Sequence, residues 1–219
     1  MTPASHPERY ETGYLGDGVI LDLESTVPLA DKDKARRAAI AWLARSVEGN
    51  PVRIVRINSP RSVIGLKDLI ALHGAEYKPD AIIIPLCRTP DEVGVVADIL
   101  DGPLSTIGII PMVELARALF AAERIANSHE RVSALFLGGG DLARDLHADG
   151  SWESLLCARS CIVAAAATRS IAAIDVPYFK SDEAGLATEA AGSRKLGMTA
   201  KAALHVEQIA TVNAIFAAE

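Results

Sequence analysis

Two carboxylates stand where strongly apolar segments of this sequence end. Glu114 ends the segment IIPMVE, and Asp141 follows the segment ALFLGGG. Two carboxylates, with water and substrate oxygens completing an octahedron, form a ligand set that suits Mg²⁺. The alternative for each acid is to cap the helix that follows it, which is an ordinary role for Asp141 and a weaker explanation for Glu114. The pair therefore predicts a Mg²⁺ site.

One arginine, Arg56, lies inside the apolar segment VRIVRINSP. A guanidinium at a buried strand end needs a bidentate anionic partner, and a substrate carboxylate or the Glu24 side chain can supply it. A purely structural ion pair is the alternative. Asp22 and Glu24 alternate along one expected strand, so both face the same way and can point into the same site.

The triple glycine 138–140 allows a ligand to approach the backbone closely. The N–H groups of Gly139 and Gly140 are candidates for holding a carboxylate or a developing enolate oxygen, and a tight strand-to-helix turn is the alternative. Lys201 and His205 belong to the last repeating unit, where a surface helix cap is the simplest interpretation of their role.

Short apolar segments alternate with helical ones along the whole chain, which is typical of a parallel α/β fold. The expected strands lie within residues 18–24, 52–58, 81–86, 106–114, 133–139, 172–179 and 199–205. Helical spacing of apolar residues covers 30–47, 65–75, 89–100, 115–127, 141–146, 151–170, 182–196 and 206–219, with Asp31, Thr89 and Asp182 as candidate caps.

Two architectures fit this alternation, a (β/α) barrel and an open doubly wound sheet. The glycine pattern of a dinucleotide-binding first turn is absent. Polar residues instead close strand after strand, namely Asp22, Glu24, Arg56, Asn58, Glu114, Asp141, Asp175 and His205. In a barrel the C-terminal ends of all strands converge on one mouth, so the pattern favours a barrel.

Composition limits the class of protein. The chain has 219 residues, of which 50% are hydrophobic and 23% charged, and its net charge is −6. These values exclude a disordered protein and disfavour a nucleic-acid or anionic-membrane surface. We expect one domain spanning residues 1–219, no membrane segment, no signal peptide and a cytoplasmic location. Three cysteines without metal-ligand spacing, including Cys157 and Cys161, predict reduced and buried thiols.

Five ordered segments are more specific than any single motif: ILDLESTVPLADKDKAR, VRIVRINSP, IIPMVELARALFAAERIA, ALFLGGGDLARDL and LGMTAKAALHVEQIATVNAIF. Together they resemble the citrate lyase β-subunit group of the HpcH/HpaI aldolase superfamily, from about Gly18 to the C-terminus. The resemblance implies a TIM-type (β/α) barrel and a Mg²⁺-dependent carbon–carbon lyase. Such enzymes act on 3-hydroxyacyl coenzyme A thioesters, for example citryl or malyl coenzyme A, and a related branch cleaves hydroxylated 2-keto acids without coenzyme A.

The resemblance also assigns roles by position. It implies that Glu114 and Asp141 bind Mg²⁺, that Arg56 grips the substrate carboxylate and that Glu24 reaches the metal-bound waters. It further implies that Lys201 and His205 lie near the nucleotide of coenzyme A.

Several departures from the family pattern bear on function. The family's opening strand, R-S-L-L-F-V-P, has no counterpart here, and Ser25, Leu86 and Val206 replace an acid, a lysine and a proline. We therefore expect a barrel whose first strand is missing or degenerate. Residues 1–16 should form an irregular or helical segment and not a strand. This segment, a neighbouring subunit or direct pairing of the flanking strands can cover the seam. The position of the last helical segment leads us to expect no C-terminal lid, which disfavours thioester hydrolysis.

Three functions remain open from the sequence. The leading one is a Mg²⁺-dependent lyase that acts through a stabilised enolate on a 3-hydroxyacyl coenzyme A or a related hydroxy or keto acid. The others are a catalytically degenerate barrel that binds a metabolite or a partner protein, and a 2-keto acid aldolase that needs no coenzyme A. The expected partners are a small acidic substrate and other copies of the chain, in a trimer or larger homo-oligomer.

Overall fold

The computed structural model describes residues 1–4, 16–46, 49–100 and 105–217. Its strands form one sheet in which each strand pairs in parallel with the next along the chain. They are β1 (Thr2–Pro3), β2 (Gly18–Asp22), β3 (Val52–Arg56), β4 (Ala81–Ile84), β5 (Gly108–Val113), β6 (Ala134–Leu137), β7 (Ala172–Asp175) and β8 (Ala200–Lys201). The seven predicted strands are therefore confirmed as β2 to β8.

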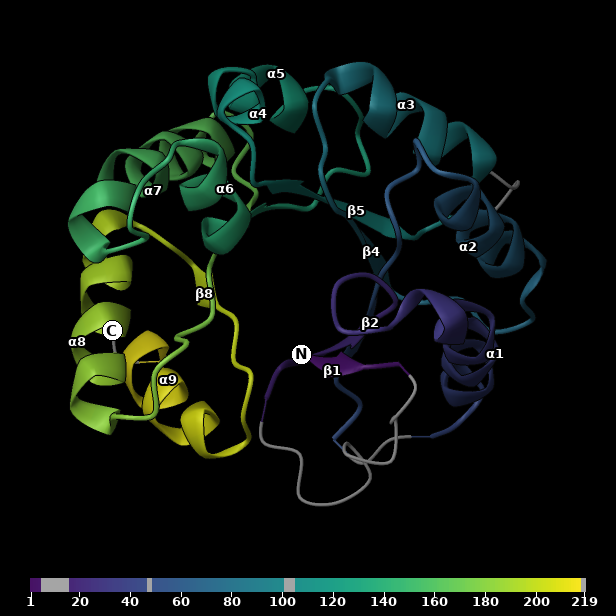
Figure 1. The fold of residues 1–219 in the computed structure, drawn as a ribbon, viewed down its shortest axis with the longest axis horizontal. Helices are drawn as coiled ribbons and strands as arrows, with labels where there is room; N and C mark the ends of the chain where they lie inside the picture. The colour runs from purple at the N-terminus through teal and green to yellow at the C-terminus, as the bar shows by residue number, and fades with distance from the viewer. Residues whose placement is uncertain (5–15, 47–48, 101–104, 218–219) are drawn as a thin grey trace.

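Helices form a ring outside the strands, in the order of the sequence (Figure 1). They are η2 (Leu29–Asp31), α1 (Lys32–Leu43), α2 (Val63–Gly74), α3 (Pro90–Ile99), α4 (Ala116–Phe120), α5 (Ala122–Ala126), α6 (Gly139–Asp145), α7 (Trp152–Ala167), α8 (Glu183–Leu196) and α9 (Glu207–Phe216). This arrangement is the predicted (β/α) barrel. None of the helices described is long and apolar enough to cross a bilayer.

Alternation along the strands divides the core into two parts. Along β5, Ile110 and Met112 pack with Phe136 in a cluster inside the barrel, whereas Ile109 and Val113 belong to the larger cluster between the strands and the helices. Successive side chains of a strand point to opposite faces, so residue parity decides which side chains enter the barrel. The interior is packed with side chains, and only the strand ends can open into a site.

The predicted helix caps are only partly confirmed. Asp182 accepts a hydrogen bond from the Gly185 N–H and caps α8, as predicted. Asp31 and Thr89 also stand directly before helices, but neither side chain makes a capping hydrogen bond. Serines cap α2 and α7 instead, since Ser62 and Ser151 accept hydrogen bonds from the third residue after each of them.

The first strand corrects a prediction from the sequence. Thr2–Pro3 forms a parallel strand on β2, so the prediction that residues 1–16 contain no strand is wrong. A strand of two residues carries no periodicity that a sequence could reveal, although its length agrees with a degenerate first strand. Residues 5–15, which make up most of the predicted irregular segment, lie outside the described residues.

The two edges of the sheet approach each other beside β8. The backbone nitrogen of Met1 donates a hydrogen bond to the Ala203 carbonyl at 2.6 Å, just beyond the end of β8. In the described part of the chain, no strand pairing joins β8 to β1. Among the described residues, the edges of the sheet are therefore joined at the seam by the Met1–Ala203 hydrogen bond and not by strand pairing.

The prediction for the cysteines is wrong at two of three positions. Cys87 is buried, but Cys157 and Cys161 lie on the exposed side of α7. The same helix buries Arg159 between them. Because α7 is rich in alanine, its two faces differ little in hydrophobicity, and periodicity could not select the buried face.

Candidate active site

The Glu114 carboxylate is a buried acid of the barrel mouth. Glu114 follows β5 in the same phase as Ile110 and Met112, so its side chain enters the barrel, where only 3% of the residue is exposed. Its Oε1 accepts a hydrogen bond of 2.5 Å from the Leu86 N–H. Leu86 follows β4 and has a φ of +52°, a left-handed conformation that aims its N–H at the carboxylate.

Gly138 provides the space in which the Glu114 side chain lies. A Cβ at position 138 would stand 2.4 Å from the Glu114 Cβ and 2.6 Å from its Oε2. No side chain fits there, so the first of the three glycines is required by its contact with Glu114. The sequence indicates a close approach to the glycine run but does not reveal that the approaching group is a carboxylate.

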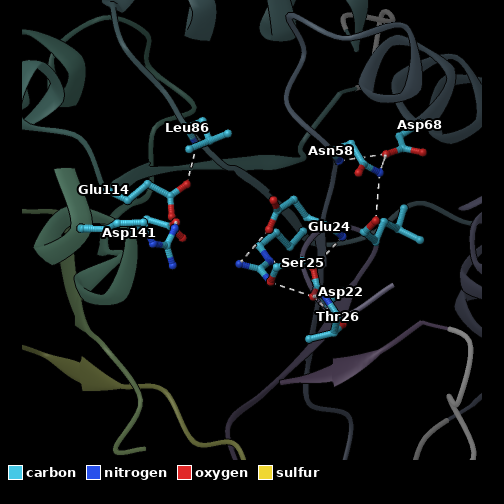
Figure 2. Close-up of polar contacts among 12 residues, drawn as sticks. Asp22, Glu24, Ser25, Thr26, Asn58, Asp68, Leu86, Glu114 and Asp141 are labelled. Atoms are coloured by element: carbon cyan, nitrogen blue, oxygen red, sulfur yellow. Dashed lines mark hydrogen bonds and ion pairs between the residues drawn. The ribbon is translucent and has the colours of Figure 1, made fainter. Parts of the chain in front are cut away.

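Burial changes the pKa of Glu114 in the way expected of a carboxylate that binds a cation. Desolvation raises the pKa of Glu114 to about 7, the Leu86 N–H and Arg56 oppose this rise, and the nearby Asp141 charge adds to it. Figure 2 shows Glu114 and Asp141 on one side of the mouth and Glu24, Ser25 and Asp22 on the other. A buried carboxylate next to a second carboxylate is stabilised in its charged form by a bound cation.

Asp141 belongs to the first turn of α6 and is half exposed, with Arg144 as its ion-pair partner at the surface. Together, Glu114 and Asp141 offer hard oxygen ligands and leave room for water and substrate oxygens, which fits Mg²⁺. Among the residues that the structure describes, no group of three or more His, Cys, Asp or Glu side chains is placed to hold a metal ion, so Glu114 and Asp141 form a pair and not a larger cluster.

The partner of Arg56 corrects a second prediction. The bidentate acceptor is Asp22, not Glu24: Arg56 Nε and Nη2 donate to the two Asp22 oxygens, both at 2.6 Å. Asp22 stands directly opposite Arg56 in the β2–β3 register. Burial alone would raise the pKa of Asp22, but its hydrogen bonds with Arg56 and Thr26 hold that pKa below its usual value.

Glu24 faces the remaining edge of the same guanidinium. Its Oε2 lies 3.4 Å from Arg56 Nη1, and its side chain is 26% exposed. The Ser25 hydroxyl accepts a hydrogen bond from Nη2. Nη1 is thus the terminal nitrogen of Arg56 that lies toward Glu24 and not toward Asp22.

Other polar groups hold the β2 loop in place, and sequence reasoning did not identify them. Lys32 Nζ donates to the carbonyls of Leu23 and Glu24 at 2.7 and 2.5 Å. Asn58, expected in the mouth, instead donates to Asp68 and to the Leu23 carbonyl. A lysine in the first turn of a helix is ordinary, and nothing in the sequence marks Lys32 as different.

The other two glycines differ in their surroundings. Gly139 is buried against Leu155 and Val176, whereas a Cβ on Gly140 would meet no atom within 4 Å. Gly139 therefore serves helix packing, and Gly140 faces open space. The contact of their N–H groups with a substrate stays a prediction.

Lys201 lies outside the mouth. Its side chain has no exposed surface, and its ammonium donates to Asp175, Glu189 and the Val176 carbonyl at 2.7–2.8 Å. Asp175 and Lys201 have the opposite parity to the barrel-facing Ile174 and Ala202, so both point toward the helices. The Lys201 ammonium thus joins β7, β8 and α8. His205 is exposed and lies beside a cavity of about 600 Å³ at the seam.

Comparisons with known proteins agree with this geometry. The chain is 35% identical over 210 residues to (3S)-malyl-CoA thioesterase of Cereibacter sphaeroides, which covers 93% of this chain and 70% of the relative. It is 32% identical over 215 residues to citrate lyase subunit beta of Escherichia coli, with the same coverage. The structure of CitE from Mycobacterium tuberculosis in complex with magnesium, acetoacetate and coenzyme A matches with a TM-score of 0.84 and 28% identity, over 100% of this chain and 79% of that one.

The family model for HpcH/HpaI aldolase/citrate lyase matches residues 8–206. This range contains the Glu114 and Asp141 carboxylates and the Asp22–Arg56 pair that together form the mouth. The chain belongs to the HpcH/HpaI aldolase/citrate lyase family.

Proposed function

We propose that this protein is a Mg²⁺-dependent carbon–carbon lyase that acts on a 3-hydroxyacyl coenzyme A thioester or a related hydroxy or keto acid. The observation that carries the proposal is the shared mouth of Glu114, Asp141 and Arg56. Arg56 and Asp141 both act on the pKa of Glu114, which supports a site in which each of them lies near that carboxylate. An acidic substrate that is chelated by Mg²⁺ needs carboxylates to hold the cation and a positive group to hold its own carboxylate. Glu114 and Asp141 supply the former, and Arg56 supplies the latter.

Each residue of the mouth has a distinct task in this proposal. Glu114 and Asp141 hold Mg²⁺, which when bound supplies a Lewis acid that stabilises the negative charge of an enolate. Asp22 fixes the Arg56 guanidinium through two hydrogen bonds, and Nη1 of Arg56 orients a substrate carboxylate. Glu24, opposite Nη1, orients water at the cation.

The relatives support the class of substrate. The Escherichia coli and Cereibacter sphaeroides proteins are named for citrate cleavage and for a malyl coenzyme A thioester, and the Mycobacterium tuberculosis structure contains magnesium, acetoacetate and coenzyme A. The proposal includes a cytoplasmic location, which three free cysteines support because disulfides persist in oxidising compartments. It also includes a homo-oligomer.

The test is turnover by the full chain with Mg²⁺ and three substrates: citryl coenzyme A, malyl coenzyme A and a 4-hydroxy-2-keto acid. Cleavage of citryl coenzyme A releases oxaloacetate and acetyl coenzyme A. Malate dehydrogenase detects the oxaloacetate through the oxidation of NADH. We expect lyase activity that disappears on addition of EDTA and in Glu114→Gln, with the Glu123→Gln variant on the outer helix α5 as the control.

Each other outcome identifies a rival function. Release of free coenzyme A without a keto acid indicates a thioesterase, as the Cereibacter sphaeroides relative is named. Cleavage of the 4-hydroxy-2-keto acid alone indicates the aldolase branch. Binding of Mg²⁺ and oxaloacetate without any turnover indicates a barrel that binds its ligand and does not transform it.

A further inference from the structure

A second cavity, of about 480 Å³, lies beside the mouth and is lined by three arginines. Its lining residues are Arg88, Thr89, Pro90, Asp91, Arg117, Ala121 and Arg124. The cavity stands between the first turn of α3 and the helices α4 and α5, which neighbour one another in the ring of helices (Figure 1). We call it the arginine pocket.

The guanidiniums of Arg88, Arg117 and Arg124 differ from those of most arginines among the described residues. Six other arginines form ion pairs with carboxylates: Arg36, Arg53, Arg56, Arg61, Arg144 and Arg159. Three more donate to backbone carbonyls: Arg131, Arg169 and Arg194. By contrast, the side chains of Arg88, Arg117 and Arg124 make no hydrogen bond or ion pair with the described residues, and the Arg88 Nε is fully enclosed without a partner.

The charge around the pocket favours a multivalent anion. Asp91 is the one carboxylate in its lining. Glu92 is engaged elsewhere, because it accepts from the Arg88 N–H and pairs with Arg61. The Thr89 side chain makes no capping hydrogen bond to α3, and Asp91 and Glu92 lie in the first turn of that helix.

We propose that the arginine pocket binds a phosphate group of a phosphorylated ligand. A guanidinium fork matches phosphate oxygens in a bidentate manner, and three forks around one cavity suit a dianion or a diphosphate better than a single carboxylate.

The position of the pocket connects it to the mouth. Arg88 comes two residues after Leu86, whose N–H holds the Glu114 carboxylate, and Arg117 comes three residues after Glu114 itself. A ligand that fills the pocket therefore lies next to the two segments that position Glu114. The coenzyme part of a thioester substrate is one source of the phosphate, which rests on the proposed function, and a free phosphorylated metabolite is the other.

The Lys201 ammonium, which the resemblance implies near the coenzyme nucleotide, is already engaged within the protein. The ammonium of Lys201 is buried and shared among three protein acceptors, so it has no donor left for a phosphate. The arginine pocket offers three cations whose donors are not used by the described residues.

The experiment is calorimetric titration of the full chain with pyrophosphate, coenzyme A, dephospho-coenzyme A and pantetheine. The pocket variant combines Arg117→Gln with Arg124→Gln, and its matched control removes two positive charges from α1 by Lys34→Gln and Arg37→Gln. We expect pyrophosphate to bind about tenfold or more weakly to the pocket variant, as loss of two charge-assisted partners implies, and equally to the control and the unaltered chain.

The other titrants identify the source of the phosphate. If the substrate supplies it, coenzyme A binds more tightly than pantetheine and the difference disappears in the pocket variant. If a free metabolite supplies it, pyrophosphate binding depends on the arginines and coenzyme A binding does not. Dephospho-coenzyme A distinguishes the 3′-phosphate from the diphosphate.

The proposal is overturned if pyrophosphate does not bind, or binds equally to the pocket variant and the control, while circular dichroism shows that both are folded. The pyrophosphate titration involves no turnover. Pyrophosphate binding without lyase activity would therefore contradict only the proposed function. Lyase activity without pyrophosphate binding would contradict only the proposed phosphate site in the arginine pocket.

Discussion

The Glu114 side chain occupies the space that any side chain at position 138 would need. In Gly138→Ala the new Cβ would lie 2.4 Å from the Glu114 Cβ, so the carboxylate must move away from the Leu86 N–H. In the proposed function, Glu114 and Asp141 are the two protein ligands of Mg²⁺. Displacement of one of them should therefore lower Mg²⁺ affinity about tenfold or more. Calorimetric titration with Mg²⁺ measures this change.

Gly140→Ala is the matched control, because a Cβ there meets no atom within 4 Å. It should leave Mg²⁺ affinity unchanged and favour α6 slightly, since alanine is a better helix former than glycine. Equal Mg²⁺ affinity in the two variants would contradict the role of Gly138 as the space for Glu114.

Protonation of Glu114 should control Mg²⁺ binding in the physiological pH range. Burial raises the pKa of Glu114 to about 7, and a proton competes with the cation below that pH. We expect the Mg²⁺ dissociation constant to fall about tenfold for each pH unit between pH 5 and 7 and to level off above pH 7. A constant affinity from pH 5.5 to 8 would show that Glu114 is ionised throughout.

The same pKa makes a prediction for the metal-free chain. The folded-state pKa of about 7 lies above 4.5, the ordinary value of a glutamate, so protonated Glu114 favours the folded state. That contribution is complete below pH 4.5 and is lost as the pH rises through 7, for a total of about 3 kcal/mol. The free energy of unfolding of Glu114→Gln should lack this decline, which denaturant titrations at several pH values would show.

Residue types predicted much of the site, and strand register decided the rest. Glu114 and Arg56 were identifiable because a charged residue at the end of an apolar strand needs a reason to be there. That Asp22 and not Glu24 holds Arg56 follows from the pairing of Asp22 with Arg56 in adjacent strands, which a sequence does not state. Leu86 acts through its backbone N–H, so its side chain gave no signal.

At the scale of elements, the buried network around Lys201 joins β7, β8 and α8. Removing one member of a buried ion pair leaves its partners charged and unpaired, so Lys201→Met should reduce the free energy of unfolding by about 3 kcal/mol. His205→Gln, at an exposed position, should change it little. Denaturant unfolding measures both variants.

Coenzyme A binding separates this structural role from the role implied by the family resemblance. We expect Lys201→Met to bind coenzyme A as the unaltered chain does, at a temperature where it is folded. A variant of unchanged stability with weaker coenzyme A binding would show that Lys201 contacts the nucleotide.

Parity within strands explains which elements supply the mouth. Ile20, Ile54 and Ile110 face the barrel interior, and the residues in phase with them are Asp22, Arg56 and Glu114. This rule was available from the sequence once the strands were placed, and it separates Asp175 and Lys201 from the site. What the sequence could not provide was the interruption of the helix predicted over 115–127, which ends as α4 and restarts as α5 after Ala121.

At the scale of the whole molecule, regular alternation of strands and helices was sufficient to predict the architecture. The choice of a barrel over an open sheet depended on polar strand ends that need a common mouth, and Figure 1 shows the ring that this requires. The seam was harder to predict, because β1 has two residues and the contact from Met1 to Ala203 is made by backbone atoms. Neither leaves a pattern in the side chains.

The outer face of α2 carries the argument for assembly. Val63 and Ile70 are 70% and 67% exposed, and Leu66 between them is 40% exposed, so the helix presents an apolar stripe to solvent. Its opposite face, with Leu69 and Leu72, packs on the barrel. Exposed apolar stripes of this kind mark surfaces that another chain covers. In the homo-oligomer that we propose, a second copy of this chain covers the stripe.

We therefore expect light scattering at micromolar concentration to give a mass above the 23.1 kDa of one chain. Ile70→Glu places a charge in the centre of the stripe and should shift the mass toward one chain. Phe120→Glu is the control, because Phe120 is 91% exposed but belongs to α4. If Phe120→Glu dissociates the assembly and Ile70→Glu does not, the interface lies at α4 and not at α2. That surface is next to the arginine pocket, so pyrophosphate binding should then depend on protein concentration.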